Sequence, residues 1–169
     1  LVLVSKLAFL GWGVGSARFN FTGISGHTML SASVWPVALW LLASRGSHRL
    51  RLGLAVFGWL LAACIGVSRL AIYAHSASEV AAGYLLGLAA SAGFLAMQRH
   101  MAHPRLRASL VALSLLLPLL QMQPGHAAPT HGLIERMAMR LAGTERPYTR
   151  DDLLRPAGAA RLGYRVPVL

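Results

Sequence analysis

His75 and Glu79 are the two residues whose types and spacing most directly fit chemistry. They stand four residues apart, a separation that places both on one face of a helix. A carboxylate bonded to one imidazole nitrogen fixes the tautomer of the ring and leaves the other nitrogen free to act as a base or a nucleophile. A His–Glu hydrogen bond at a helix start, without chemistry, is the competing interpretation of this pair alone.

Ser25, Gly26 and His27 form a second polar group, directly before an apolar run. A helix start exposes free N–H groups and a partial positive charge, and both hold anions well. Gly26 would let the backbone come close to a ligand. Ser25 has the simpler alternative of capping the helix and nothing more.

The composition indicates that membrane helices position these residues. Hydrophobic residues make up 56% of the 169-residue chain and charged residues only 12%, with a mean hydropathy of +0.56. Soluble domains carry about 25% charged residues. A soluble enzyme, a disordered chain and a disulfide scaffold are therefore excluded, and Cys64 is the single cysteine. The net charge of +11 does not indicate a nucleic-acid partner, because the basic residues flank apolar runs.

Four apolar stretches predict an all-α, polytopic transmembrane helix bundle, since a span needs about 20 residues. They cover residues 28–44, 52–67, 80–98 and 108–122. Leu1 to Ala17 is predicted as the end of a further span, so we expect the chain to be N-terminally incomplete. Gly83 and Gly87 in GYLLG have the spacing of a close helix contact.

The chain is expected to divide into a transmembrane core, residues 1–122, and a C-terminal tail, residues 123–169. Apolar residues at helical spacing predict an amphipathic helix that begins after Thr130 and ends near Gly143. This helix either lies flat on the membrane or belongs to a poorly ordered surface tail. The prolines beyond it predict a mostly irregular end.

The arginine-rich connections predict the orientation in a bacterial inner membrane. One connection carries Arg45, Arg49 and Arg51, and another, two crossings later, carries Arg99, Arg105 and Arg107. Both therefore lie on the same side, which the positive-inside rule assigns to the cytoplasm. The other two connections then share the periplasmic face, at the membrane boundary, and bring together Ser25, Gly26, His27, Arg69, His75 and Glu79.

Three cations complete this group, namely Lys6, Arg18 and Arg69. Lys6 and Arg18 have the alternative of snorkelling at the interface. Arg69 stands against the positive-inside bias, which favours a function, and it meets the same substrate as His75 only if the chain bends between them. Phosphoryl transfer needs positive donors around the phosphate oxygens, a nucleophile and an acid for the leaving group. Arginines would here replace the usual magnesium.

A metal site is the other use for His27, His75 and Glu79, as a three-ligand zinc set. The sequence has no HExxH pattern and no cysteine partner, and the nearby arginines would repel a cation. We therefore expect no metal and no other cofactor.

At these residues the sequence resembles the type 2 phosphatidic acid phosphatase superfamily. The segment SRLAIYAHSASE, from Ser68 to Glu79, is similar to its third motif, with Glu in place of Asp. ISGH, residues 24–27, is similar to its second motif, with Ile24 in place of Pro. Lys6 and Arg18 stand in for the first motif at a longer spacing. The resemblance covers about residues 6–97.

The resemblance implies a role for each matching residue. His75 attacks phosphorus and forms a phosphohistidine, Glu79 orients it, and His27 protonates the leaving oxygen. Arg69 holds the phosphate, with help from Lys6 and Arg18, and Ser25 and the Gly26 amide complete the cradle.

The implied function is an integral membrane phosphatase that acts on a lipid phosphate or diphosphate. Phosphatidate, phosphatidylglycerophosphate and polyprenyl diphosphate are the implied substrate types. The alternatives are a lipid phosphotransferase on the same fold and a membrane protein with a decayed site. A vanadate-dependent haloperoxidase ranks below both. Membrane lipids are the expected partners, and the sequence predicts no oligomeric state.

Overall fold

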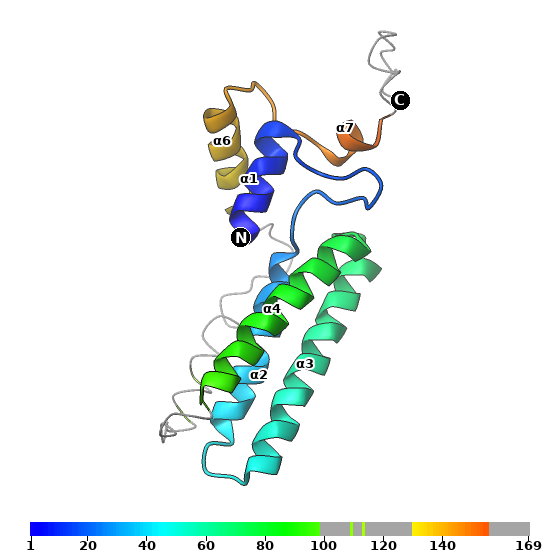
Figure 1. The fold of residues 1–169 in the computed structure, drawn as a ribbon. Coiled ribbons are helices and arrows are strands. Elements are labelled where there is room, and N and C mark those ends of the chain that lie inside the picture. The colour runs from blue at the N-terminus through cyan, green and yellow to red at the C-terminus, as the bar shows by residue number, and fades with distance from the viewer. Residues whose placement is uncertain (99–108, 110–112, 114–129, 156–169) are drawn as a thin grey trace. The chain divides into compact units, whose positions relative to one another are not determined.

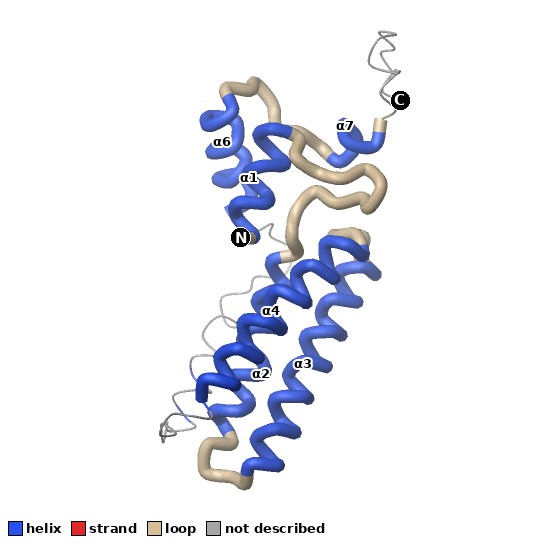
Figure 2. The backbone as a smooth tube through the Cα atoms, viewed as in Figure 1, coloured by secondary structure: helices blue, strands red, loops and turns tan. Residues whose placement is uncertain are grey.

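The computed structural model describes residues 1–98, 109, 113 and 130–155. Within these ranges every named element is a helix (Figures 1 and 2), so the all-α prediction is confirmed there. Ser16 and Phe21 form one isolated β-bridge. The helices are α1 (Val2–Trp12), α2 (Gly26–Leu42), α3 (His48–Ala71), α4 (Ala77–Gln98), α6 (Thr130–Ala142) and α7 (Arg150–Leu154).

The chain divides into two compact units. The three-helix unit comprises Val2 and Ile24–Ala128, with the described helices α2, α3 and α4. The terminal unit comprises Leu1, Leu3–Gly23 and Pro129–Leu169, with α1, α6 and α7. The domain boundary expected at residue 122 stays a prediction, because it falls outside the described residues.

Two helices of the three-helix unit are long and apolar enough to cross a membrane. α3 has 24 residues and α4 has 22, each contains an 18-residue stretch with a mean hydropathy of 2.0 and 1.8 respectively, and little of either stretch is buried within the protein. They contain the predicted spans 52–67 and 80–98. α3 begins earlier than predicted because Ser47 caps it, accepting a hydrogen bond from the Leu50 N–H at 3.3 Å.

The other predicted spans fare differently. α2, with 17 residues, begins and ends two residues earlier than the predicted span 28–44. α1 ends at Trp12 rather than near Ala17, because Gly13 takes a left-handed conformation (φ 66°) and its N–H turns back to the Phe9 carbonyl. The predicted span 108–122 lies almost wholly outside the described residues.

Small residues let α2 approach both neighbouring helices closely, and the contact with α4 lies at the glycine pair of GYLLG, whose spacing predicted a close helix contact. A Cβ atom on Gly83 would lie 2.6 Å from the Ser25 carbonyl oxygen, and one on Gly87 would meet the Met29 carbonyl oxygen. On α3, a Cβ atom on Gly58 would lie 2.6 Å from the Pro36 nitrogen. α2 therefore packs along both α3 and α4 (Figure 1).

Two hydrogen bonds through Ser91 also link the three helices. The Trp59 indole N–H donates to Ser91 Oγ at 2.9 Å, and the Ser91 hydroxyl donates to the Ala32 carbonyl at 2.8 Å. Such hydrogen bonds across apolar helices stabilise a bundle whose surroundings offer no competing water. They fix the register of α2, α3 and α4.

In the terminal unit, α6 packs on α1 and confirms the predicted tail helix. Ala138 is fully buried, and a Cβ atom on Gly11 of α1 would lie 3.2 Å from its carbonyl oxygen. The helix ends before Gly143, whose φ of 67° is left-handed.

Between α6 and Arg155 the chain forms one short helix, α7, within the segment that was expected to be mostly irregular, and residues 156–169 lie outside the described residues. Thr149 and Asp152 form a reciprocal capping box at the start of α7, and the Tyr148 N–H donates to the Leu10 carbonyl at 2.9 Å. Arg150 donates to Asn20 Oδ1 and Thr22 Oγ1. These contacts to the N-terminal segment are long-range, so local composition did not reveal them.

The glycine contact on α3 gives a stability prediction. Gly58→Ala should lower the thermal unfolding midpoint in detergent, because the new methyl group meets the α2 backbone and overpacking costs about 1–3 kcal/mol. Gly53→Ala is the matched control on the same helix, since a Cβ atom at that position would meet nothing within 4 Å. Equal midpoints for the two variants would contradict the packing described.

Candidate active site

The chain reverses between α3 and α4, and this reversal brings Arg69 and His75 to the same end of the three-helix unit. α3 ends at Ala71 and α4 begins at Ala77. The Tyr73 N–H donates to the Leu70 carbonyl at 2.9 Å and the Ala74 N–H to the Arg69 carbonyl at 3.1 Å. This is a Schellman motif, with Tyr73 at the left-handed position (φ 54°). The bend that the sequence required is therefore present.

His75 and Glu79 are paired, as their spacing predicted. His75 precedes α4 rather than lying in it, and its Nδ1 is 2.8 Å from Glu79 Oε2. Because a carboxylate only accepts, Nδ1–H donates in this contact, and in the neutral ring Nε2 then carries the lone pair. Glu79 is fully buried, whereas the His75 side chain is 15% exposed. The imidazole is thus held on one side and reachable on the other.

Glu79 also caps α4, a role that the sequence interpretation missed. The Ser76 N–H donates to Glu79 Oε2 at 3.2 Å, and the Glu79 N–H donates to Ser76 Oγ at 3.4 Å. This reciprocal pair is a capping box, for which the pattern Ser-x-x-Glu was visible in the sequence. The helix start therefore anchors the carboxylate that holds His75, and Glu serves in both roles.

The start of α2 lies beside the start of α4. The Ser25 N–H donates to the Glu79 carbonyl at 3.1 Å. The Ser25 hydroxyl is fully buried and lies 2.9 Å from Thr28 Oγ1, so it does not cap α2 through a backbone N–H. Gly26 is half-buried and His27 is exposed in the first turn of α2.

Arg69 lies in the last turn of α3, half-buried. One turn earlier, Gly66 packs against Thr28 of α2 and Val80 of α4. Among the described residues, the buried Nε–H of Arg69 has no hydrogen-bond partner. An unsatisfied buried donor costs about 1–3 kcal/mol, so this guanidinium suits an acceptor supplied by a ligand.

Lys6 and Arg18 belong to the terminal unit. Lys6 is half-buried beside Gly23, and Arg18 is exposed, with its guanidinium carbon 5.6 Å from the centroid of the Phe19 ring. Their expected role in phosphate binding stays a prediction.

Within the described ranges, no three His, Cys, Asp or Glu side chains gather as a metal site would require.

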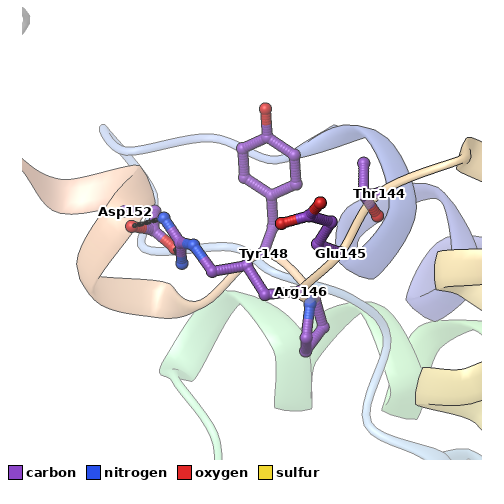
Figure 3. Close-up of a pocket in the computed structure, with 6 residues that line it drawn as sticks. Thr144, Glu145, Arg146, Tyr148 and Asp152 are labelled. Atoms are coloured by element: carbon purple, nitrogen blue, oxygen red, sulfur yellow. Dashed lines mark hydrogen bonds and ion pairs between the residues drawn. The ribbon is translucent and has the colours of Figure 1, made fainter.

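The terminal unit contains a hollow that could bind a ligand. The hollow, of about 610 Å³, is lined by Thr144, Glu145, Arg146, Pro147, Tyr148 and Asp152 (Figure 3). Hydrogen bonds from Arg146 and Thr149 hold the pKa of Asp152 well below its usual range. The Arg146 and Asp152 charges of this hollow are therefore already paired.

The comparison with protein families confirms the family that the sequence resembled. The model of the PAP2 superfamily matches residues 7–102, more than half of the chain. This chain belongs to the PAP2 superfamily. The match contains both motifs, from Ser25 to Glu79, and Arg18, while Lys6 lies one residue before it.

A relative in Klebsiella pneumoniae is 44% identical over 160 residues, which cover 93% of this chain and 77% of that protein. It is described as an uncharacterized 22.5 kDa protein in cps region. No solved structure matches the chain. Together with the two apolar helices, the family membership makes this a helical membrane protein with a phosphatase-type fold.

The His75–Glu79 pair gives a spectroscopic prediction. In the unaltered protein above pH 8, the ¹⁵N shifts of His75 should report the Nδ1–H tautomer, because the carboxylate accepts that proton. Glu79→Gln should give a mixture of tautomers, since an amide both donates and accepts. His75→Gln assigns the signal. An Nε2–H tautomer in the unaltered PAP2 protein would contradict the assigned geometry.

Proposed function

We propose that this PAP2 protein is an integral membrane phosphatase that hydrolyses a lipid phosphate or diphosphate through a phosphohistidine. The observation that carries the proposal is the 2.8 Å contact between His75 Nδ1 and the buried Glu79 carboxylate. It leaves the lone pair of Nε2 on the reachable side of a partly exposed ring. That is the arrangement a nucleophilic imidazole needs.

The proposed reaction has two steps. His75 Nε2 attacks phosphorus and forms a bond between nitrogen and phosphorus, the bond from that phosphorus to the lipid oxygen (in a diphosphate, to the bridging oxygen) breaks, and His27 donates a proton to the leaving oxygen. Glu79 stabilises the positive charge that develops on the His75 ring. A water molecule, giving a proton to His27, then attacks the phosphorus, the bond between Nε2 and phosphorus breaks with its electron pair returning to Nε2, and inorganic phosphate leaves.

Arg69 is proposed to hold the phosphate oxygens during both steps. Its Nε–H lacks a partner among the described residues, and fixed cations stabilise charge on the transferred group where it develops. The Gly26 amide at the start of α2 would add a neutral donor. In this scheme the chain itself supplies the positive charge, so activity should persist in the presence of a chelator.

Glu79 supports an intact site over a decayed one. A Glu in place of the family's Asp is one methylene longer, and its carboxylate nevertheless reaches both His75 Nδ1 and the Ser76 N–H. The substitution therefore preserves the hydrogen bond that the mechanism needs.

The location follows from the charge pattern. We propose a multi-pass protein of the bacterial inner membrane, with His75 facing the periplasm at headgroup level. Arg45, Arg49 and Arg51 lie at the opposite ends of the helices, in the connection from α2 to α3 and the first turn of α3, where the positive-inside rule favours the cytoplasm. The lipid tail of a substrate would then stay in the bilayer while its phosphate reaches Arg69.

A lipid assay tests the proposal. Phosphate release from phosphatidate, phosphatidylglycerophosphate and polyprenyl diphosphate is measured in detergent with a chelator present. His75→Ala should lose roughly 10³-fold or more of the rate on the preferred lipid, since it removes the nucleophile. His131→Ala, a histidine of α6 in the terminal unit, is the control that should keep the rate.

Two further readouts sharpen this assay. With radiolabelled lipid, rapid denaturation should trap an acid-labile phosphoenzyme on the unaltered protein and none on His75→Ala, whereas His27→Ala should form and hydrolyse it more slowly, because His27 is the acid of the first step and the base of the second. Label that appears in a lipid or alcohol acceptor instead of inorganic phosphate would identify a phosphotransferase. Release by His75→Ala at the unaltered rate would refute the mechanism.

A further inference from the structure

Arg51 is a buried cation without an anionic partner, at the end of the three-helix unit opposite to His75. It lies in the first turns of α3 and is only 4% exposed. Its guanidinium carbon is 4.1 Å from the centroid of the Trp40 ring, and Trp40, near the end of α2, is buried too. The His48 ring meets Trp40 edge-on, with 5.6 Å between ring centroids.

The chain offers no nearby carboxylate that would neutralise Arg51. Glu79 is the single acid before Glu135, and it lies at the other end of the three-helix unit. Arg51 and Arg69 lie 18 positions apart on α3, which separates the two ends by about 27 Å. An internal ion pair is therefore excluded for Arg51 within this unit.

One buried N–H group of this cation and one of the adjacent Trp40 ring have no hydrogen-bond acceptor. Within the described part of the chain, neither Nε of Arg51 nor Nε1 of Trp40 has a hydrogen-bond partner. Buried polar groups are nearly always hydrogen-bonded, and buried charges are nearly always paired. The contact with the Trp40 ring offsets part of the cost of burying Arg51, but it satisfies neither N–H group.

The backbone adds to the positive potential at this place. Arg51 and Arg49 both lie near the N-terminus of α3, where the helix dipole is positive, and the first turn of α3 has no acidic residue. Cations at this end of a helix are unfavourable unless an anion is present. The helix N-terminus, the Arg51 guanidinium and the Trp40 indole therefore all favour a negatively charged acceptor.

We propose that Arg51 and Trp40 form a second anion site, which binds the phosphate group of an anionic phospholipid or free phosphate. Guanidinium and indole only donate, so the ligand must be an acceptor, and phosphate oxygens accept from several directions at once. Arg51 lies near the start of α3, a helix of membrane-spanning length, which places it at the depth of lipid headgroups. This site is independent of the proposed hydrolysis at His75.

The test is the thermal unfolding midpoint of the full chain in neutral detergent, followed during titration with three probes. They are phosphatidylglycerol, phosphatidylcholine and inorganic phosphate, at constant ionic strength. A ligand that binds the folded state raises the midpoint with its concentration. All titrations are repeated in an Arg69→Gln background, so that binding at the His75 end does not contribute.

Arg51→Met carries the sharpest expectation. It removes a buried unpaired charge while keeping the contact with Trp40, so the midpoint without added ligand should stay equal or rise, and the increment from the anionic probe should vanish. Arg51→Gln should weaken the apparent affinity roughly tenfold or more, the equivalent of losing a charge-assisted hydrogen bond. Arg49→Gln, an exposed arginine of the same turn, should keep most of the increment.

The probes also distinguish the source of the phosphate. An increment with phosphatidylglycerol alone identifies a lipid headgroup, whereas an increment with inorganic phosphate identifies a free anion. As a second measurement, native mass spectrometry should count one fewer retained phosphatidylglycerol in Arg51→Gln than in Arg49→Gln if the lipid is the ligand. No increment with either anion, or an undiminished increment in Arg51→Met, would overturn the proposal.

Discussion

The structure depends on a single hydrogen-bonded carboxylate, that of Glu79. It is the one acid in the first 134 residues, it is fully buried, and it bonds both the His75 ring and the backbone at the start of α4. A buried carboxylate is stable only where such donors surround it. The same carboxylate therefore holds the end of the α3–α4 connection and orients the imidazole, so a substitution of Glu79 would remove both interactions.

Close packing of the apolar helices holds that carboxylate in place. α2 comes close enough for the Ser25 N–H to reach the Glu79 carbonyl only because Gly83 has no side chain at the point of contact. Gly66 does the same one turn before Arg69, where Thr28 and Val80 close in. Since these contacts are between backbone and small side chains, they leave little freedom for the helix ends that carry the polar residues.

Much of this could be predicted from the sequence, and the failures are of two kinds. Long apolar runs and the His75–Glu79 spacing are local signals, so α3, α4 and the pair itself were predicted correctly. The docking of Arg150 on Asn20 and the burial of Arg51 against Trp40 depend on contacts that no local pattern shows. The end of α1 at Gly13, by contrast, is a local glycine cap that the interpretation did not use. The capping box at Ser76 was a local signal that the interpretation did not use. The roles of Lys6 and Arg18 remain predictions, because both lie in the terminal unit whereas His75 and Arg69 lie in the three-helix unit.

The most direct test of the central claim is a structure of the protein with orthovanadate, which mimics phosphorus bonded to five atoms. We expect vanadium bonded to His75 Nε2, with Arg69 donating to its oxygens and the His27 ring facing the same anion. Vanadate bound away from His75, or the rings of His27 and His75 directed into separate regions, would contradict the account.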